Sequence, residues 1–195
     1  MSDREPQPER GGDRDHRPRA TPRVWVGSLA DYNNGRLHGE WINADQSAEE
    51  LDLAIRWMLA SAPTPDAEEW GIFDFDGFTA IRIDEHEDLE TVSKLAHGIK
   101  EHGIGFAIWA ELVDKDLHRL DQFEDAYLGV YDSREAYAEH LLDDIGVPER
   151  IEGLPDWLQP YIEIDYQSLS DAMWISGDIS FADHGGKVWV FDGRI

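Results

Sequence analysis

Histidines and carboxylates are the side chains of this sequence that could bind a metal ion, and one short stretch gathers them. Residues 84–88 read Asp-Glu-His-Glu-Asp, with His86 at the centre. His97 and His102 lie five residues apart and therefore point to different sides of a helix. Because the HExxH spacing of helical zinc sites is missing, we interpret residues 84–88 as a solvated acidic loop or helix start. We predict no metal site and no cofactor.

A carboxylate pair that could do acid–base chemistry occurs where Asp74 and Asp76 flank Phe75. The chain has 42 Asp and Glu residues, so such pairs arise by chance and indicate a hydrolase only weakly. The sequence contains no GxSxG, Walker A or GxGxxG motif. Cysteine is absent, which excludes a cysteine nucleophile and thiolate metal ligands. An enzyme is therefore not predicted.

Acidic side chains dominate the composition. The 195 residues carry 17 Lys and Arg against 42 Asp and Glu, a net charge of −25 with His neutral. Such a charge disfavours direct binding to nucleic acid, because each phosphate would meet net like charge. Hydrophobic residues still make up 41% of the chain, which is enough for packed cores. No apolar run approaches 18 residues and the polar start lacks a signal segment, so we expect a cytoplasmic protein without membrane contact.

The charge is unevenly distributed along the chain. Residues 1–23 contain six Arg, five acids and four of the nine prolines, with almost no apolar side chains. This composition predicts a disordered, dispensable Arg/Pro-rich tail. Residues 24–195 have 11 basic and 37 acidic residues, so the predicted folded part carries a net charge of −26.

Acids recur throughout the folded part, on helix faces opposite the apolar stripes. A solvated polar face explains where these acids lie, but not why basic residues are so scarce among them. We therefore predict that many of them bind a partner. The candidate carboxylates are those of Glu49, Glu50, Asp52, Glu68, Glu69, Asp84, Glu85, Glu87, Asp88, Glu90, Glu111, Asp114, Asp116, Asp121, Glu124, Asp125, Glu135, Glu139, Asp143 and Asp144.

Two explanations fit this charge. One is adaptation to high salt, which enriches Asp and Glu generally. The other is presentation of a phosphate-like array to a DNA-binding protein. Duplex DNA carries about two charges per base pair, so −26 corresponds to ~13 base pairs, or ~26 for a dimer, which is the scale of a DNA-binding footprint. Composition leaves both explanations open.

Periodicity and turn signals predict an α+β fold class, a row of three small modules with small antiparallel sheets. The αβ, α-helical and αβ modules cover residues 24–83, 84–126 and 127–195. In the first module, a capping box at residues 47–50 is expected to start a helix that covers the sheet. The strands of this module are expected at residues 24–29, 37–43 and 70–75, with a hairpin turn at 33–35.

The other two modules are predicted in the same way. Helices of the second module are expected from residue 89 up to Gly103, at 104–113 and at 116–126. The third module is expected to have a strand at 127–132, a helix from Ser133 to Gly146, a helical turn at Pro155, a helix at 165–175 and a hairpin of 180–182 with 187–191. We interpret His184, which precedes Gly185 and Gly186, as part of the hairpin turn.

The sequence resembles the ArdA antirestriction proteins over about residues 24–191. The resemblance rests on an ordered set of segments, and the tail is not part of the pattern. The matching segments are residues 24–35 (VWVGSLADYNNG), 39–42 (GEWI), 68–70 (EEW), 74–78 (DFDGF) and 123–133 (FEDAYLGVYDS), followed by Tyr137 and Ala138.

The resemblance implies a dimeric mimic of B-form DNA that occupies the DNA-binding site of type I restriction–modification enzymes. Such proteins are elongated and three-modular, are carried on mobile elements and are not enzymes. The resemblance therefore predicts two partners, the methyltransferase core of a type I enzyme and a second copy of the chain. It places the dimer contact and the antirestriction motif near residues 125–144. Aromatic candidates for that contact are Tyr127, Tyr131, Tyr137, Trp174 and Trp189.

Two other function classes stay open at this point. The first is a salt-adapted acidic adaptor without DNA mimicry, and the second is a carboxylate-based hydrolase. Only a DNA mimic would displace duplex DNA from a type I methyltransferase core.

Overall fold

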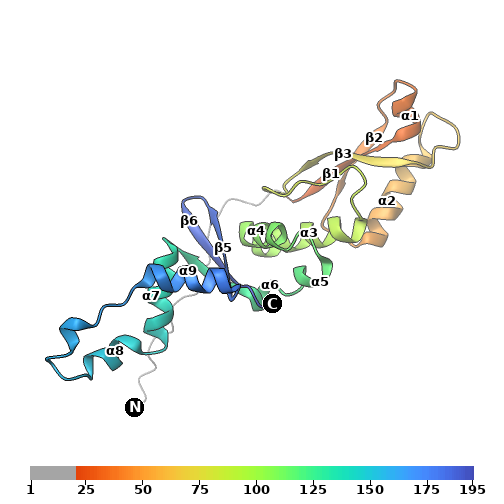
Figure 1. The fold of residues 1–195 in the computed structure, drawn as a ribbon. Helices are drawn as coiled ribbons and strands as arrows, with labels where there is room; N and C mark the ends of the chain where they lie inside the picture. The colour runs from red at the N-terminus through yellow and green to blue at the C-terminus, as the bar shows by residue number, and fades with distance from the viewer. Residues whose placement is uncertain (1–20) are drawn as a thin grey trace, which may run out of the picture. The chain divides into compact units, whose positions relative to one another are not determined.

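The structure is a computed structural model and describes residues 21–195 (Figure 1). The predicted tail at residues 1–23 lies almost entirely outside the described residues. Two compact units make up the described chain, and the chain passes from one to the other between Phe123 and Glu124. Each unit contains one antiparallel sheet of three strands, so the α+β class with small antiparallel sheets is confirmed. The division into three modules stays a prediction.

The first unit begins with a sheet of strand order β2-β1-β3. Val24 pairs with Ile42 on one side, and Val26 pairs with Ile72 on the other. All four side chains are buried, because residues two apart on a strand share one face. The strands are β1 (Arg23–Ser28), β2 (Gly39–Asn43) and β3 (Trp70–Asp76).

The turn predicted at residues 33–35 is present at Asn34 and Gly35, but it does not join β1 and β2 by itself. A short helix, α1 (Leu29–Asn33), follows β1 directly, because Ser28 Oγ accepts a hydrogen bond from the backbone N–H of Asp31 and caps that helix. The chain then reverses at Gly35, whose φ of 72° suits glycine. The strands still pair antiparallel as predicted, but a helical turn and a loop join them.

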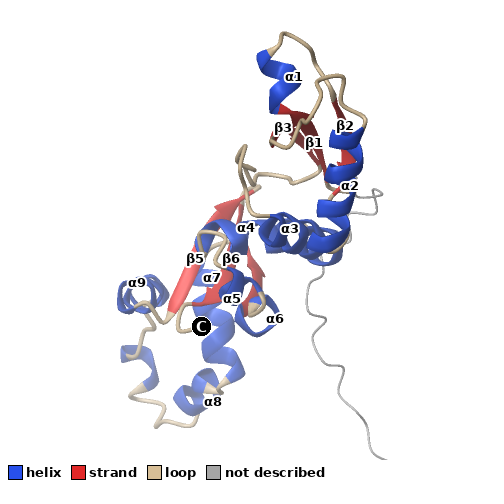
Figure 2. Ribbon diagram, turned by 90° about the vertical axis from the view of Figure 1, so that its right-hand side faces the viewer, coloured by secondary structure: helices blue, strands red, loops and turns tan. Residues whose placement is uncertain are grey.

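Helix α2 (Ala48–Ala60) covers the first sheet, as predicted (Figure 2). Its capping box is complete, since Ser47 and Glu50 each accept a hydrogen bond from the other's backbone N–H. Leu51, Ile55 and Met58 are buried, so the expected apolar stripe forms the contact with the strands.

Four helices follow in the chain: α3 (Leu89–His102), α4 (Ile104–Leu112), α5 (Leu117–Leu120) and α6 (Phe123–Ala126). The prediction of a single helix at residues 116–126 is wrong. Trp109 Nε1 donates a hydrogen bond to the carbonyl oxygen of Arg119 at 2.9 Å, and the N–H of Gln122 donates to the same oxygen at 3.0 Å. That carbonyl is therefore not available to the N–H of Phe123, and the helix ends.

The second unit contains a sheet of strand order β4-β6-β5. The predicted terminal hairpin is confirmed: β5 and β6 pair along their length, and His184 pairs with Lys187 at the tip. Gly185 and Gly186 both have positive φ there, as a two-residue hairpin turn of this kind requires. The strands are β4 (Tyr127–Tyr131), β5 (Ile179–His184) and β6 (Lys187–Asp192).

The helices of the second unit are α7 (Arg134–Asp144), α8 (Val147–Glu152), η1 (Gln159–Tyr161) and α9 (Tyr166–Ser176). The predicted ends at Ser133, Gly146 and Gly177 are confirmed for α7 and α9. Helix α8 is not among the helices predicted from the sequence. Pro148 lies in the first turn of α8, where its missing N–H is not needed.

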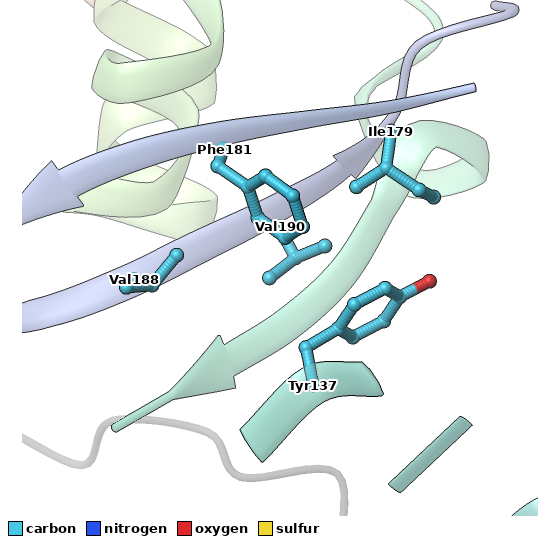
Figure 3. Close-up of a cluster of buried hydrophobic side chains, with 5 residues drawn as sticks. All are labelled: Tyr137, Ile179, Phe181, Val188 and Val190. Atoms are coloured by element: carbon cyan, nitrogen blue, oxygen red, sulfur yellow. The ribbon is translucent and has the colours of Figure 1, made fainter. Parts of the chain in front are cut away.

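The core of the second unit lies between helix α7 and the hairpin (Figure 3). Tyr137 points from α7 towards the strands, and its ring meets that of Phe181 edge-on with centroids 5.9 Å apart. Ile179 extends the cluster along β5, while Val188 and Val190 contribute from β6. Within residues 21–195, no helix has the length and apolar character needed to cross a membrane.

Candidate partner-binding surface

The predicted carboxylates lie on the surface of both units. Of the 20 candidate residues, all but Asp52 and Glu87 are exposed, and these two are half-buried. The exposure follows from the amphipathic helices, whose apolar faces are turned to the cores. The carboxylates differ, however, in whether their oxygens already bind within the chain.

Three of the candidates cap helices. Glu50 accepts hydrogen bonds from Ser47 at its backbone N (2.9 Å) and Oγ (3.0 Å), and these bonds lower the pKa of its carboxyl. Asp88 caps α3, and Asp116 caps α5, each by accepting two backbone N–H groups. Their charges remain exposed, but part of their hydrogen-bonding capacity is used.

A second group of candidates pairs with basic side chains. Asp52 binds Arg56 one helical turn away, with 2.7 Å between Oδ2 and Nε. Asp121 binds Lys94 at 2.8 Å. Lys115 pairs with both Asp84 and Glu87, and Asp144 lies 3.6 Å from His140. A basic partner would have to compete with these pairs.

The remaining candidates keep their oxygens available for a partner. Glu135 is a special case, since the Ser133 hydroxyl bonds its carboxylate and lowers the pKa of that group. In the part of the chain that the structure describes, no ion pair or helix cap occupies Glu49, Glu68, Glu69, Glu85, Glu90, Glu111, Asp114, Glu124, Asp125, Glu139 or Asp143.

Sequence reasoning missed further acids beyond Asp144. Glu149, Glu152, Asp156 and Glu163 lie on and around α8 and η1, and all are exposed. The composition of this stretch could have revealed them, because residues 145–164 hold four acids against one basic residue. The acidic surface therefore extends through the segment between α7 and α9.

The aromatic residues that the resemblance suggested for a dimer contact divide into two groups. Tyr137 and Trp189 are buried within their own unit, so neither is available to a second copy. This corrects the prediction for Tyr137, whose ring the α7–hairpin core requires. Tyr127 packs against Phe191, with ring centroids 5.8 Å apart, and Tyr131 is half-buried against Tyr137. Only Trp174 among the suggested residues is more than half exposed.

Large apolar side chains are exposed elsewhere in the second unit. Trp157 is 71% exposed, Tyr161 is 83% exposed and Ile175 is 79% exposed. Burying such side chains is favourable, and Trp and Tyr are common anchors of protein interfaces. Periodicity does not reveal these residues, since nothing in the local pattern distinguishes them from core residues.

Other chemistry finds little support in the side-chain geometry. Across residues 21–195, no three His, Asp or Glu side chains gather as a metal site would require. Asp74 and Asp76 are exposed on β3, and Asp76 pairs with Arg23 at 3.0 Å. A shallow cleft of about 780 Å³ lies beside β3, but its acids are Asp84, which pairs with Lys115, and Glu85.

Comparison with known protein families gives a match that covers most of the chain. The family of antirestriction proteins called ArdA matches residues 24–188. A search of curated protein sequences gave no match. The family match spans both units and leaves out only the first 23 residues and the last seven. The chain therefore belongs to the ArdA family of antirestriction proteins.

Proposed function

We propose that this antirestriction protein is a mimic of B-form DNA that competes for the DNA-binding site of a type I restriction–modification enzyme. The observation that carries the proposal is the set of exposed carboxylates on both units, most of them free of internal partners. Family membership supplies the antirestriction activity. A cytoplasmic location and carriage on a mobile element are part of the same proposal.

The mechanism follows from the charge. The basic groove of the enzyme attracts the acidic protein over a long range, which raises the rate of encounter. In the complex, carboxylates replace phosphates and accept charge-assisted hydrogen bonds from the Arg and Lys side chains that hold the DNA backbone. Since phosphate contacts position DNA without reading its sequence, one mimic can block enzymes with different recognition sequences.

The mimic acts only by competition. A carboxylate array offers the enzyme neither a phosphodiester bond to cleave nor a base to methylate. Occupation of the methyltransferase core would therefore exclude duplex DNA without turnover. Cleavage and modification would both stop wherever they depend on the occupied groove.

We propose that the protein acts as a homodimer, in which a second copy covers the exposed apolar side chains of the second unit. Two chains of net charge −25 repel each other, so their contact needs a sizeable apolar centre. Trp157, Tyr161 and Ile175 supply such surface, whereas the buried Tyr137 does not. Two acidic chains in one complex would also extend the phosphate-like array.

Competition with duplex DNA tests the proposed function. A fluorescent duplex bound to a type I methyltransferase core should be displaced by the protein, with an affinity that falls steeply as salt rises. Neutralising Glu49 or Asp114 alone should weaken displacement less than tenfold, because exposed ion pairs contribute about 0.2–1 kcal/mol. Removing five or six unpaired carboxylates of one unit should cost several decades of affinity.

Two outcomes would contradict the proposal. If the duplex stays bound at all protein concentrations, the chain is not a DNA mimic, and a salt-adapted adaptor becomes the better interpretation. If one substitution abolishes displacement while multiple neutralisations elsewhere do nothing, the target recognises a localised site. A matched control set replaces Asp52, Asp121 and Asp144, whose carboxylates are already paired, and should weaken displacement less per charge.

Sedimentation tests the dimer separately. The wild type should be dimeric at micromolar concentration and moderate salt, and the double variant W157S/Y161S should be monomeric. A monomeric wild type would contradict the dimer. The control L37S changes a side chain that is 75% exposed in the first unit, and it should leave the dimer intact.

A further inference from the structure

All four lysines of this acidic chain bind carboxylates from distant segments. Lys94 reaches Asp121 at 2.8 Å, and the other pairs are Lys100 with Asp45, Lys115 with Glu87 and Lys187 with Asp132. The partners are separated by 27, 55, 28 and 55 residues, respectively. Lysine in this chain therefore connects segments that are far apart in the sequence.

Lys115 is the most enclosed connection of this kind in the acidic surface. Its side chain is 23% exposed, and that of its partner Glu87 is 15% exposed. The ammonium group also donates to the carbonyl oxygen of Arg82 at 3.0 Å and lies 3.7 Å from Asp84 Oδ2. One lysine thus binds three groups of the loop that precedes helix α3.

The backbone at Lys115 is held in an unusual conformation. Asp114 and Lys115 both have positive φ, 51° and 56°, which residues other than glycine rarely adopt. The N–H of Lys115 donates to the carbonyl oxygen of Ala110 at 2.9 Å and closes the end of α4. This turn directs the lysine side chain towards residues 82–88, and the contacts made there offset its conformational cost.

Lys115 connects two segments that are rich in candidate carboxylates. Residues 84–90 contribute five of them, and residues 111–116 contribute three. Like charges in the two segments repel each other, and a cation between them cancels part of that repulsion. The lysine therefore fixes how far one group of carboxylates lies from the other.

We propose that Lys115 is a positioning residue of the DNA-mimic surface, which holds the acids of residues 84–90 and 111–116 at the spacing that the target's basic groove accepts. This inference rests on the proposed function and adds to it. A cation would then be required for the binding of a polyanion mimic. Charge alone predicts the opposite, because every basic residue should weaken attraction to a basic groove.

The sign of the effect separates these two views. Lys115→Met makes the net charge more negative by one, so a mimic governed by charge alone should displace duplex DNA more strongly. If Lys115 positions the acids, the same variant should bind about tenfold more weakly or worse, since several carboxylates move away from their partners. Arg36→Met is the matched control, because it makes the same charge change at an exposed side chain of the same unit. Its displacement should equal or exceed that of the wild type.

Hydrogen exchange of the free protein gives a readout that does not depend on any target. In K115M, amides of residues 82–90 and 111–117 should exchange faster, while those of α2 and of the second unit keep their protection. Lys115→Arg keeps the cation and should restore most of both the protection and the binding. The double variant E87Q/K115M removes the carboxylate that K115M leaves enclosed, so it stays folded and keeps the test valid should K115M unfold.

Failure of the positioning role and failure of the proposed function give different results. If the wild type does not displace duplex DNA, the proposed function fails, and the exchange data alone decide whether Lys115 holds the two segments. If the wild type competes but both K115M and E87Q/K115M match the R36M control, the positioning role of Lys115 is overturned. Unchanged exchange in residues 82–90 of K115M would overturn it as well.

Discussion

Gly98 shows how a single residue determines the packing of the helical region. A Cβ atom added at Gly98 would lie 2.3 Å from the ring of Phe106, which is itself buried on α4. Gly103 then allows the chain to reverse between α3 and α4 with a φ of 70°. The two glycines let the helices approach with an aromatic ring between them.

The variant Gly98→Ala should therefore be less stable than the wild type. At an exposed helix position alanine is more favourable than glycine by about 1 kcal/mol. Overpacking of a core, however, costs about 1–3 kcal/mol. We expect the cost to dominate and the free energy of unfolding in urea to fall by about 1 kcal/mol or more. Gly153→Ala is the control, since its Cβ would make only ordinary contacts at 3.5 Å. A stabilised G98A would show that Phe106 can move aside.

Asp45 illustrates a charged residue whose role is structural. Its side chain is 11% exposed, and it accepts hydrogen bonds from Lys100 and, at 3.2 Å, from His97 Nδ1. Lys100 is the main cause, with His97 second, of the lowered pKa of its carboxyl. Nearby, Ser93 Oγ donates to the carbonyl oxygen of Gln46 at 2.6 Å. These contacts attach the loop before α2 to helix α3.

The variant Asp45→Asn should change the pH dependence of stability in a defined direction. A carboxyl whose pKa is lower in the folded state stabilises the fold at pH values above its unfolded pKa of about 3.9. This contribution disappears as pH falls through the folded pKa. In thermal unfolding, wild type should exceed D45N in Tm at pH 7, and the gap should narrow below about pH 4. A gap that stays constant to the lowest pH would contradict the ion pair.

At the scale of elements, the capping box of α2 makes a measurable contribution. Ser47→Ala removes the side chain that accepts the N–H of Glu50 at 3.2 Å. N-cap substitutions of this kind cost about 1 kcal/mol, so the free energy of unfolding of the first unit should fall by that amount. Ser47→Asn retains a capping oxygen and should recover most of the loss. Equal destabilisation by both variants would indicate that the hydroxyl has another role.

Local signals predicted most element boundaries correctly. The capping box at Ser47, the cap at Ser133 and the stop at Gly177 all depend on neighbours within four residues, so the sequence displays them directly. The helix expected at residues 116–126 is interrupted instead by Trp109, which lies ten residues from its partner Arg119. A tertiary hydrogen bond of that kind leaves no trace in the hydrophobic period.

The candidate surface was predictable in part for the same reason. Exposure of the acids follows from helix amphipathicity, which the sequence displays. Whether an acid is free or paired depends on contacts such as Lys115 with Glu87, 28 residues apart, which only the fold brings together. The burial of Tyr137 is likewise a property of the packed unit, because α7 has few strongly apolar positions and Tyr137 occupies one of them.

At the scale of the whole molecule, the N-terminal tail should be dispensable. A variant that begins at Thr21 retains Pro22, whose carbonyl oxygen accepts the N–H of Ala44, and Arg23, which pairs with Asp76. The removed residues 1–20 have a net charge of zero with His neutral and few apolar side chains. We expect the Tm and the displacement of duplex DNA to equal those of the full chain. A clear loss of either would assign a role to the tail.

Salt should have opposite effects on the free protein and on its complex. The Debye length falls from about 10 Å at 0.1 M salt to about 3 Å at 1 M. In the free protein, salt mainly screens repulsion among the excess carboxylates, so Tm should rise as sodium chloride increases from about 0.05 M to about 0.5 M. In the complex, the same ions compete with carboxylate–basic pairs, so displacement of duplex DNA should weaken when corrected for the salt dependence of the duplex itself.

The two salt series together distinguish a DNA mimic from a protein that is acidic for another reason. A salt-adapted adaptor shares the rise in Tm, because the net charge of −25 repels itself whatever its purpose. Only a mimic also displaces duplex DNA from the methyltransferase core, with an affinity that decreases over the same range. Differential scanning fluorimetry and the competition assay should be run in the same buffers. A Tm that falls with salt would show that the internal ion pairs, rather than repulsion, dominate the electrostatics of the fold.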